Sequence, residues 1–355
     1  MRILITGNMG YLGSVLVGYL RERYPGAELA GFDTGFFAHC LTAARGLPEC
    51  LTDLQHFGDL RQFPASLLDG VDTVVHLAAI SNDPMGNQFE AVTEQINATA
   101  TAELARLARR AGVRRFVFAS SCSIYGATGG APRKESDEVN PLTAYARSKV
   151  ATEQALAGLC DSRFVGTSLR FATACGMSPR LRLDLVFNDF VAAALSAGEI
   201  RVLSDGTPWR PLIHVRDMAR AIDWAMLRDA SCGGEHAVVN AGSETWTFQM
   251  ADLARRVAAL LPGTSLSINT AAAPDRRTYR VDFSRFRQLA PEHQPAISLE
   301  TAVAELGDGL RAMDFRDREF RNSWLIRLAV LRGLVDAGSL DAELYWTAKA
   351  RSEAP

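Results

Sequence analysis

Residues 2–13 read RILITGNMGYLG, and this stretch decides the fold. Its first five residues are a continuous apolar run, typical of a strand buried on both faces of a parallel sheet. The run leads directly into glycines at positions 7, 10 and 13, and the helical stretch SVLVGYLRERY follows. Such glycines allow a tight turn, close approach of the backbone to a pyrophosphate, and close packing of helix on strand. The order predicts a dinucleotide-binding unit and disfavours the alternative, a glycine-rich turn without a ligand.

The ends of the following strands extend the predicted cofactor site. ELAGFD ends in Asp33, whose carboxylate would bind the adenosine ribose and repel a 2′-phosphate, which favours NAD over NADP. Asp59 either contacts adenine or is a solvated loop residue, and the small side chains that end DTVVHLAA would let a cofactor lie against the backbone. The predicted cofactor contacts are Gly7, Asn8, Met9, Gly10, Tyr11, Leu12, Gly13, Asp33, Asp59, Leu60, Leu77, Ala78, Ala79, Tyr145 and Lys149.

The stretch 116–149 carries the predicted chemistry. It begins with FVFASSCSIYG, a short apolar strand with serines at its C-terminal end, the edge where open α/β sheets bind ligands. Downstream, NPLTAYARSK predicts a helix that starts at Thr143 or at the Asn140-Pro141 pair. Tyr145 and Lys149 are four residues apart and share a face of this helix. We expect the cation to favour the phenolate of a side chain whose ordinary pKa is about 10.

His76, in the fourth strand, is the other side chain that suggests a catalytic base. No carboxylate that would orient it lies nearby in the sequence, so we favour a structural or cofactor-lining role. A Tyr-x-x-x-Lys match is weak alone, but here it follows a serine cluster and a nucleotide-binding N-terminus, and that order is more specific.

The alternation of strands and helices predicts an α/β fold, a Rossmann-type doubly wound parallel sheet. We expect an NAD-binding domain over 1–174 and a smaller mixed α/β substrate lobe over 175–314, interleaved with the sheet. A helical C-terminal extension would cover 315–355. Its apolar stripe with basic residues allows a membrane-surface or calmodulin-type helix, but acids also occur on its polar face, which favours packing on the body or a partner. The helix around Asn97–Ala111 is expected to be core or subunit interface.

Composition excludes several classes. The 355 residues are 48% hydrophobic and 22% charged, with a net charge of −2, so the chain lacks the basic footprint of a nucleic-acid-binding protein. The six cysteines form no CxxC pair and no zinc spacing, so we expect reduced thiols and no metal site. RILITG leaves no room for a signal peptide and no apolar run is long enough to span a membrane, which predicts a cytoplasmic protein.

Candidate substrate contacts lie mainly in the second half of the chain. Arg210 and the Arg276-Arg277 pair offer guanidinium groups suited to phosphate, although surface solvation is as good a reading for each. Asn188 is a candidate hydrogen-bonding partner of a phosphate or sugar, and the alternative is an amide on the surface of a helix. The complete predicted set is Ser81, Asn82, Ser121, Ser123, Thr173, Asn188, Arg210, Arg276 and Arg277.

Seven motifs carry a resemblance to a known family: GNMGYLG, Asp33, HLAA, SSCSIYG, YARSK, LRFATACG and RPLIHVRD. Their order and spacing resemble the extended short-chain dehydrogenases/reductases, and more closely the nucleotide-sugar epimerase/dehydratase group, over about the first 285 residues. The resemblance implies catalytic roles for Ser121, Tyr145 and Lys149, diphosphate binding by Arg210 and Arg276 or Arg277, a nucleotide-diphosphate sugar as substrate, and a homodimer.

Three departures from the family pattern narrow the activity. Cys122 and Ser123 stand where related 4,6-dehydratases have Asp-Glu, which disfavours dehydration. Cys122 lies three residues before Tyr125, whereas the cysteine of related 3,5-epimerases lies two before, so a packed thiol is an alternative. Thr173 replaces the asparagine of the usual strand.

These patterns together predict an NAD-dependent nucleotide-sugar epimerase that acts through a transient 4-keto sugar. The alternatives are a keto-sugar reductase or sugar dehydrogenase with exchangeable NAD(P)H, and a non-catalytic NAD-binding protein.

Overall fold

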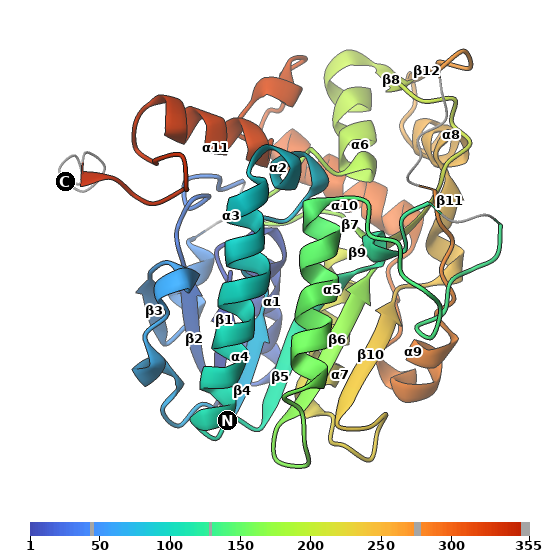
Figure 1. The fold of residues 1–355 in the computed structure, drawn as a ribbon. Helices are drawn as coiled ribbons and strands as arrows, with labels where there is room; N and C mark the ends of the chain where they lie inside the picture. Colours follow the sequence, from blue (N-terminus) through green and yellow to red (C-terminus); the bar gives the residue numbers. More distant parts are fainter. Residues whose placement is uncertain (43–45, 128–129, 273–277, 349–355) are drawn as a thin grey trace.

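The computed structural model describes residues 1–42, 46–127, 130–272 and 278–348. Its largest sheet has seven strands in the order β10-β6-β5-β4-β1-β2-β3, all pairs parallel (Figure 1). The strands are β1 Arg2–Thr6, β2 Glu28–Asp33, β3 Leu54–Phe57, β4 Thr73–His76, β5 Arg115–Ser121, β6 Val165–Phe171 and β10 His236–Ala241. The predicted doubly wound parallel sheet is confirmed. Strand order reverses at β1, so a ligand crevice is expected outside the carboxyl ends of β1 and β4.

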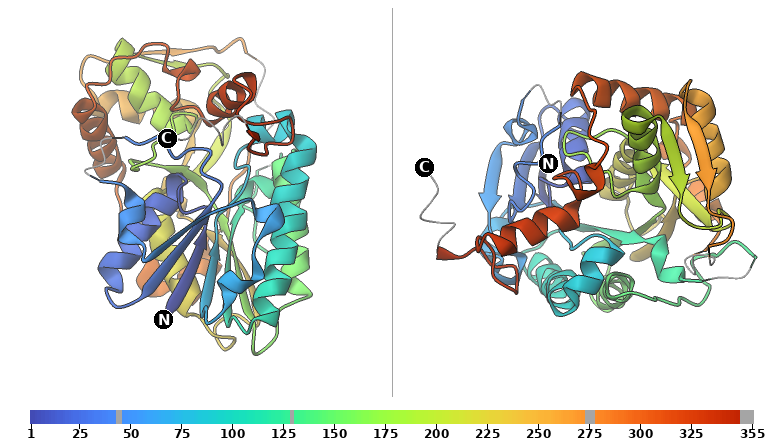
Figure 2. Two further views of the ribbon diagram at one scale, coloured as in Figure 1. Left: turned by 90° about the vertical axis from the view of Figure 1, so that its left-hand side faces the viewer. Right: turned by 90° about the horizontal axis from the view of Figure 1, so that it is seen from above.

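Helices cover both faces of this sheet (Figures 1 and 2). One face packs on α1 Tyr11–Arg23 and α7 Val215–Leu227, and the other on α4 Thr101–Arg110 and α5 Ala144–Ala157. A six-residue π-helix, Gln95–Ala100, leads into α4, so the helix expected from residue 97 onward begins in a wider turn. The homodimer expected for this chain stays a prediction.

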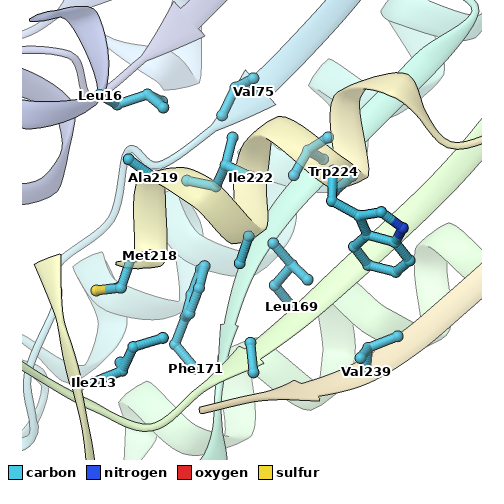
Figure 3. Packing of buried hydrophobic residues seen from close by; sticks show 14 of the residues in the cluster. Leu16, Val75, Leu169, Phe171, Ile213, Met218, Ala219, Ile222, Trp224 and Val239 are labelled. Carbon is cyan, nitrogen blue, oxygen red and sulfur yellow. The ribbon is translucent and has the colours of Figure 1, made fainter. Parts of the chain in front are cut away.

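Alternation along the buried strands builds the two hydrophobic layers. Ile3 and Ile5 point into the layer with α1 and α7, whereas Leu4 points into the layer with α4 and α5. Figure 3 shows the first layer, where Leu16 of α1 and Val75 of β4 lie near the side chains of α7. Because both faces are buried, the central strands are largely apolar, which explains the unbroken run at residues 3–5.

The smaller lobe begins where β6 ends. It contains a three-stranded sheet with the strand order β11 Thr247–Gln249, β9 Trp209–His214, β7 Thr173–Cys175. A two-stranded sheet pairs β12 Ser265–Ile268 with β8 Glu199–Val202. The helices of the lobe are α6 Val186–Ala197, α8 Met250–Leu260 and α10 Leu299–Ala312, whereas α9 Ser284–Leu289 packs beside β10 of the large sheet. Strand β10 and helix α7 lie in the same part of the sequence yet belong to the large sheet and its cover, so the chain passes between the two units repeatedly.

The C-terminal extension packs on the body of the protein. Its helix α11, Arg327–Asp336, lies beside the short helices α2 Asp83–Gln88 and α3 Glu90–Glu94 at the carboxyl end of the sheet (Figure 1). Leu331, Leu340 and Leu344 are fully buried in the same core cluster as the α4 and α5 face of the sheet. Across the described residues, no helix is long and apolar enough to cross a bilayer.

Two glycines of α1 allow a matched test of how closely this helix packs on the preceding turn. A Cβ at residue 13 would lie 2.3 Å from the carbonyl oxygen of Gly7, and this backbone atom has little room to move. We expect Gly13→Ala to lower the free energy of unfolding by roughly 2–3 kcal/mol. At Gly18 the nearest atom is a leucine methyl at 4.0 Å, so Gly18→Ala should be neutral or stabilising by up to about 1 kcal/mol. Urea unfolding measures both, and equal effects would contradict the close packing at residue 13.

Candidate active site

One large cavity lies outside the carboxyl ends of the strands, between the sheet and the smaller lobe. Its volume is about 680 Å³, within the range of small-molecule sites. The glycine turn and the ends of β2 and β4 form one side of its wall, and β5 and α5 form another. The side that belongs to the smaller lobe consists of residues before α6 and around β9. The site lies where strand order reverses, as expected for an open α/β sheet.

The glycine turn is shaped for an anion. Gly10 is the N-cap of α1 with extended backbone and no side-chain cap, so the first N–H groups of the helix remain for another acceptor. Gly7 has a φ of +75°, and a Cβ there would lie 2.6 Å from the amide nitrogen of Ala78. Asp33 accepts hydrogen bonds from the N–H groups of Met9 at 3.1 Å and Gly35 at 2.8 Å, so the end of β2 is tied to the turn. These features fit a dinucleotide.

Most predicted cofactor residues line the cavity, and two do not. Asn8 is buried and donates to Gln55 Oε1 at 2.6 Å, and Met9 is 5% exposed, so neither side chain reaches the cavity. The carboxylate of Asp59 is held by Arg61 at 2.6 Å, so Asp59 is an ion-paired residue of the rim and not the free loop residue of the alternative. The predicted residues in the wall are Gly7, Gly10, Tyr11, Leu12, Gly13, Asp33, Asp59, Leu60, Leu77, Ala78, Ala79, Tyr145 and Lys149.

The three predicted catalytic residues meet in this cavity. Thr143 is the N-cap of α5 and accepts from the N–H of Ala146 at 3.1 Å, which starts the helix at the first of the two predicted places. Two residues later Tyr145 reaches the end of β5, where Ser121 forms a hydrogen bond with it. Lys149 donates to the carbonyl of Ala119 at 2.8 Å, and its Nζ lies 5.3 Å from the centroid of the Tyr145 ring.

Burial controls the protonation of this group. Desolvation raises the pKa of Tyr145 to about 12; the nearby Asp83 adds to the rise, while the hydrogen bond with Ser121 and the charge of Arg182 oppose it. Desolvation also lowers the pKa of Lys149 to about 7. The expectation that the lysine brings the phenol toward working pH is therefore wrong for the protein alone, because the charged forms of both groups lose hydration.

His76 and Cys122 have structural roles. His76 is buried between the hydroxyls of Thr6 and Thr101, at 2.7 and 2.8 Å, and burial lowers its pKa to about 3, so the ring stays neutral. Cys122 is fully buried and its Sγ contacts the carbonyl of Arg170 at 3.1 Å, which matches the packed thiol. Within the described part of the chain, no three His, Cys, Asp or Glu side chains are grouped so as to hold a metal ion.

The predicted substrate residues separate into three sets. Those in the cavity wall are Ser81, Asn82, Ser121, Ser123, Thr173 and Arg210. Asn188 is wrong as a substrate contact: its amide is fully buried and binds the N–H of Gly176 and the carbonyl of Arg182, both at 2.8 Å, away from the cavity. Arg276 and Arg277 lie outside the described residues.

Sequence reasoning missed an ionic pair beside Tyr145. Arg182 donates to both oxygens of Asp184 at 2.9 Å and to Ser81 Oγ at 3.0 Å, and Asp184 accepts from Asn82 at 2.6 Å. This network joins the loop after β4 to the loop before α6, across the cavity. The charged residues of LRLDL, just before a helix in a nucleotide-binding chain, were the available signal.

The low pKa of Lys149 makes stability depend on pH. Between about pH 7 and pH 9 the unfolded chain binds a proton at residue 149 that the folded chain has lost, so the folded state gains stability as pH rises. The free energy of unfolding of the wild type, minus that of Lys149→Met, should therefore increase by up to about 1.4 kcal/mol per pH unit in this window. Chemical unfolding at several pH values measures it.

The control is Lys134→Met, because this lysine is exposed. The wild type minus this variant should stay flat over the same pH window. An equally flat difference for Lys149→Met would show that the buried lysine keeps its proton.

Comparisons with known proteins agree with this geometry. A model of the NAD dependent epimerase/dehydratase family matches residues 3–242. The chain is 28% identical over 315 residues to the uncharacterised UDP-glucose epimerase YtcB of Bacillus subtilis, covering 85% of this chain and 96% of that protein. It is 30% identical over 262 residues to a UDP-glucose 4-epimerase of Streptomyces lividans, covering 68% and 76%.

A solved structure has the same fold. The structure of MoeE5 in complex with UDP-glucose and NAD superposes with a TM-score of 0.73 at 29% identity, over 88% of this chain and 99% of that one. The family match ends at residue 242, so it does not extend to the C-terminal extension.

Proposed function

Because the chain belongs to the NAD-dependent epimerase/dehydratase family, we propose that it is a nucleotide-sugar epimerase that keeps NAD bound through turnover and acts by a transient 4-keto sugar. The observation that carries the proposal is the meeting of Ser121, Tyr145 and Lys149 in the cavity that also contains the glycine turn. The similarity to UDP-glucose epimerases supports a nucleotide-diphosphate sugar as the substrate.

The residues of the chain supply proton transfer and positioning. Tyr145 Oη takes the proton of a sugar hydroxyl that Ser121 holds by a hydrogen bond, and later returns it. NAD held in this cavity would supply the acceptor and donor of a hydride at the same carbon, for the two faces of the sugar. To take the hydroxyl proton Tyr145 must first be a phenolate, a form that the charge of Arg182 favours and that Lys149 also favours when it carries its proton.

Arg210 is proposed to bind the substrate diphosphate. It lines the cavity from β9, with its guanidinium carbon 5.4 Å from the centroid of the Tyr279 ring. A guanidinium held by stacking keeps its N–H groups in a fixed plane, a geometry that suits the paired oxygens of a phosphate. Binding through the diphosphate would leave the hexose free to turn between the two hydride transfers.

The identity of residues 122 and 123 supports epimerisation over dehydration within the family. A dehydratase must remove a hydroxyl as water, which needs an acid and a base next to the sugar. Here Cys122 is fully buried, burial raises the pKa of its thiol, and Ser123 offers only a hydroxyl.

Proton NMR of the sugar distinguishes epimerase from reductase. Purified protein is mixed with UDP-, GDP-, CDP- or dTDP-hexoses and no nicotinamide is added. We expect one of them to be converted to a stereoisomer over many turnovers, because the cofactor is regenerated in place. Conversion only in proportion to added NAD or NADH would indicate a dehydrogenase or reductase, and no conversion of any hexose under either condition would favour the non-catalytic alternative.

Two variants test the proton-transfer roles. Tyr145→Phe should lower kcat by roughly 10³-fold or more and Ser121→Ala by roughly 10²-fold, because each removes a group that acts on the sugar hydroxyl in the transition state. Bound NAD, measured by absorbance after denaturation, should stay near the wild-type level in both. Wild-type turnover in either variant would refute its role, and loss of NAD would indicate a damaged fold.

A further inference from the structure

The segment 315–348 borders the cavity although it lies beyond the family match. Two of its arginines, Arg321 and Arg327, belong to the cavity wall. Viewed from above, the segment crosses from the smaller lobe to the loops at the carboxyl ends of β2 and β3 (Figure 2). We call residues 315–348 the C-terminal strap.

The strap binds both sides of the cavity. At one end Arg321 pairs with Asp189 of α6 at 2.8 Å. At the other end the indole N–H of Trp346 donates to the carbonyl of Thr34 at 2.8 Å, directly after Asp33. The guanidinium carbon of Arg61, which holds Asp59, lies 3.5 Å from the centroid of a strap tyrosine ring. The strap therefore holds the two loops that carry the predicted adenosine contacts.

Arg327 is a buried charge that has no ionic partner among the described residues. It is 1% exposed, its Nη2 donates to the carbonyl of Arg180 at 2.8 Å, and its guanidinium carbon lies 4.8 Å from the centroid of the Phe37 ring. Its Nη1 is shielded from water and has no hydrogen-bond partner, and among the described residues no carboxylate lies within 4 Å. Burial lowers the pKa of Arg327 to about 10, so it remains charged at neutral pH.

The other two arginines near Arg327 are paired. Arg180 pairs with Glu49 at 2.5 Å and Arg182 with Asp184 at 2.9 Å, whereas no carboxylate of the described residues lies within 4 Å of Arg327. Of these three guanidinium groups, that of Arg327 is the one whose charge is not offset by a contacting carboxylate. A shielded charge is costly unless an anion offsets it, and its field reaches further there than in water.

The same cavity has one place prepared for an anion. The first turn of α1 has no acidic residue and no side-chain cap at Gly10, so its N–H groups face the cavity without a carboxylate from the helix. The positive end of the helix and the unpaired arginine together match the two negative charges of a dinucleotide diphosphate.

We propose that the C-terminal strap closes over the cofactor cleft and that Arg327 supplies the charge that offsets the diphosphate of the bound dinucleotide. The proposal depends on NAD as the cofactor in the proposed function and not on which reaction follows. The charge of Arg327 acts on the diphosphate from its buried position in the cavity wall. The hydrogen bond of Trp346 to Thr34 keeps the loop after Asp33, a predicted adenosine contact, in place.

Ligand affinities test the role of Arg327, measured by calorimetry on full-length protein freed of nucleotide. Arg327→Met should weaken ADP and NAD roughly 10- to 100-fold, the scale of a charged interaction, and leave adenosine within about twofold. Arg327→Lys should restore most of the affinity. The control Arg316→Met removes an exposed strap arginine, paired with Asp314 at 2.8 Å, and should change nothing.

Three outcomes would overturn the role of Arg327. Unchanged ADP affinity would show that its charge is not used, and an equal loss for adenosine would indicate a purely structural residue. A loss for UDP with ADP unaffected would assign the charge to the nucleotide-sugar diphosphate. Measuring these affinities requires no turnover, so the test of Arg327 stays valid even if the NMR experiment rejects epimerisation.

A second variant tests the strap without changing its charge. Trp346→Phe keeps an aromatic ring against Phe36 but removes the N–H that binds Thr34. We expect NAD to dissociate severalfold faster, measured by exchange with labelled NAD, with little change in the melting temperature. An unchanged dissociation rate would show that the strap does not retain the cofactor.

Discussion

A contact between two backbone segments underlies the site. Where α1 leaves the glycine turn, a Cβ at residue 13 would lie 2.3 Å from the carbonyl of Gly7, so the helix can lie this close to the turn only as glycine. This packing fixes the N-terminal end of α1 at the cavity. The first residue of the helix, Tyr11, then donates to the carbonyl of Gly176 at 2.7 Å and so sets the smaller lobe relative to the sheet. The position of every bound group depends on this approach.

The pKa values of the site follow from the burial of its titratable groups. Burial alone moves the pKa of Tyr145 up and that of Lys149 down, which is unfavourable for a phenolate beside an ammonium. Arg182 opposes the rise at Tyr145, and Arg327 adds a charge that has no carboxylate within 4 Å among the described residues. A guanidinium without a contacting carboxylate therefore lies in the wall of a space that a doubly negative molecule would fill.

The sequence predicted the sheet, the glycine turn and the meeting of Ser121, Tyr145 and Lys149, because each is a local pattern with a local cause. The cap of α5 at Thr143 and the end of β5 at Ser121 could be predicted from neighbouring residues in the sequence. The rule that parallel strands end at one edge of the sheet then placed them together. Contacts that join distant segments were not predictable in this way. Asn188 was predicted to contact the substrate, but its amide is hydrogen-bonded to backbone groups. For Arg327, no pattern near it in the sequence indicates that it reaches the cavity from the last tenth of the chain.

The position of the strap in the sequence sets the order of events during biosynthesis. Trp346 bonds to a carbonyl 312 residues earlier, so this contact cannot form until residue 346 has left the ribosome. The sheet can assemble before that point, because domains generally fold from the N-terminus as they emerge. A nascent chain would thus have an open cleft until residue 346 emerges, which delays firm loading of the cofactor to that point.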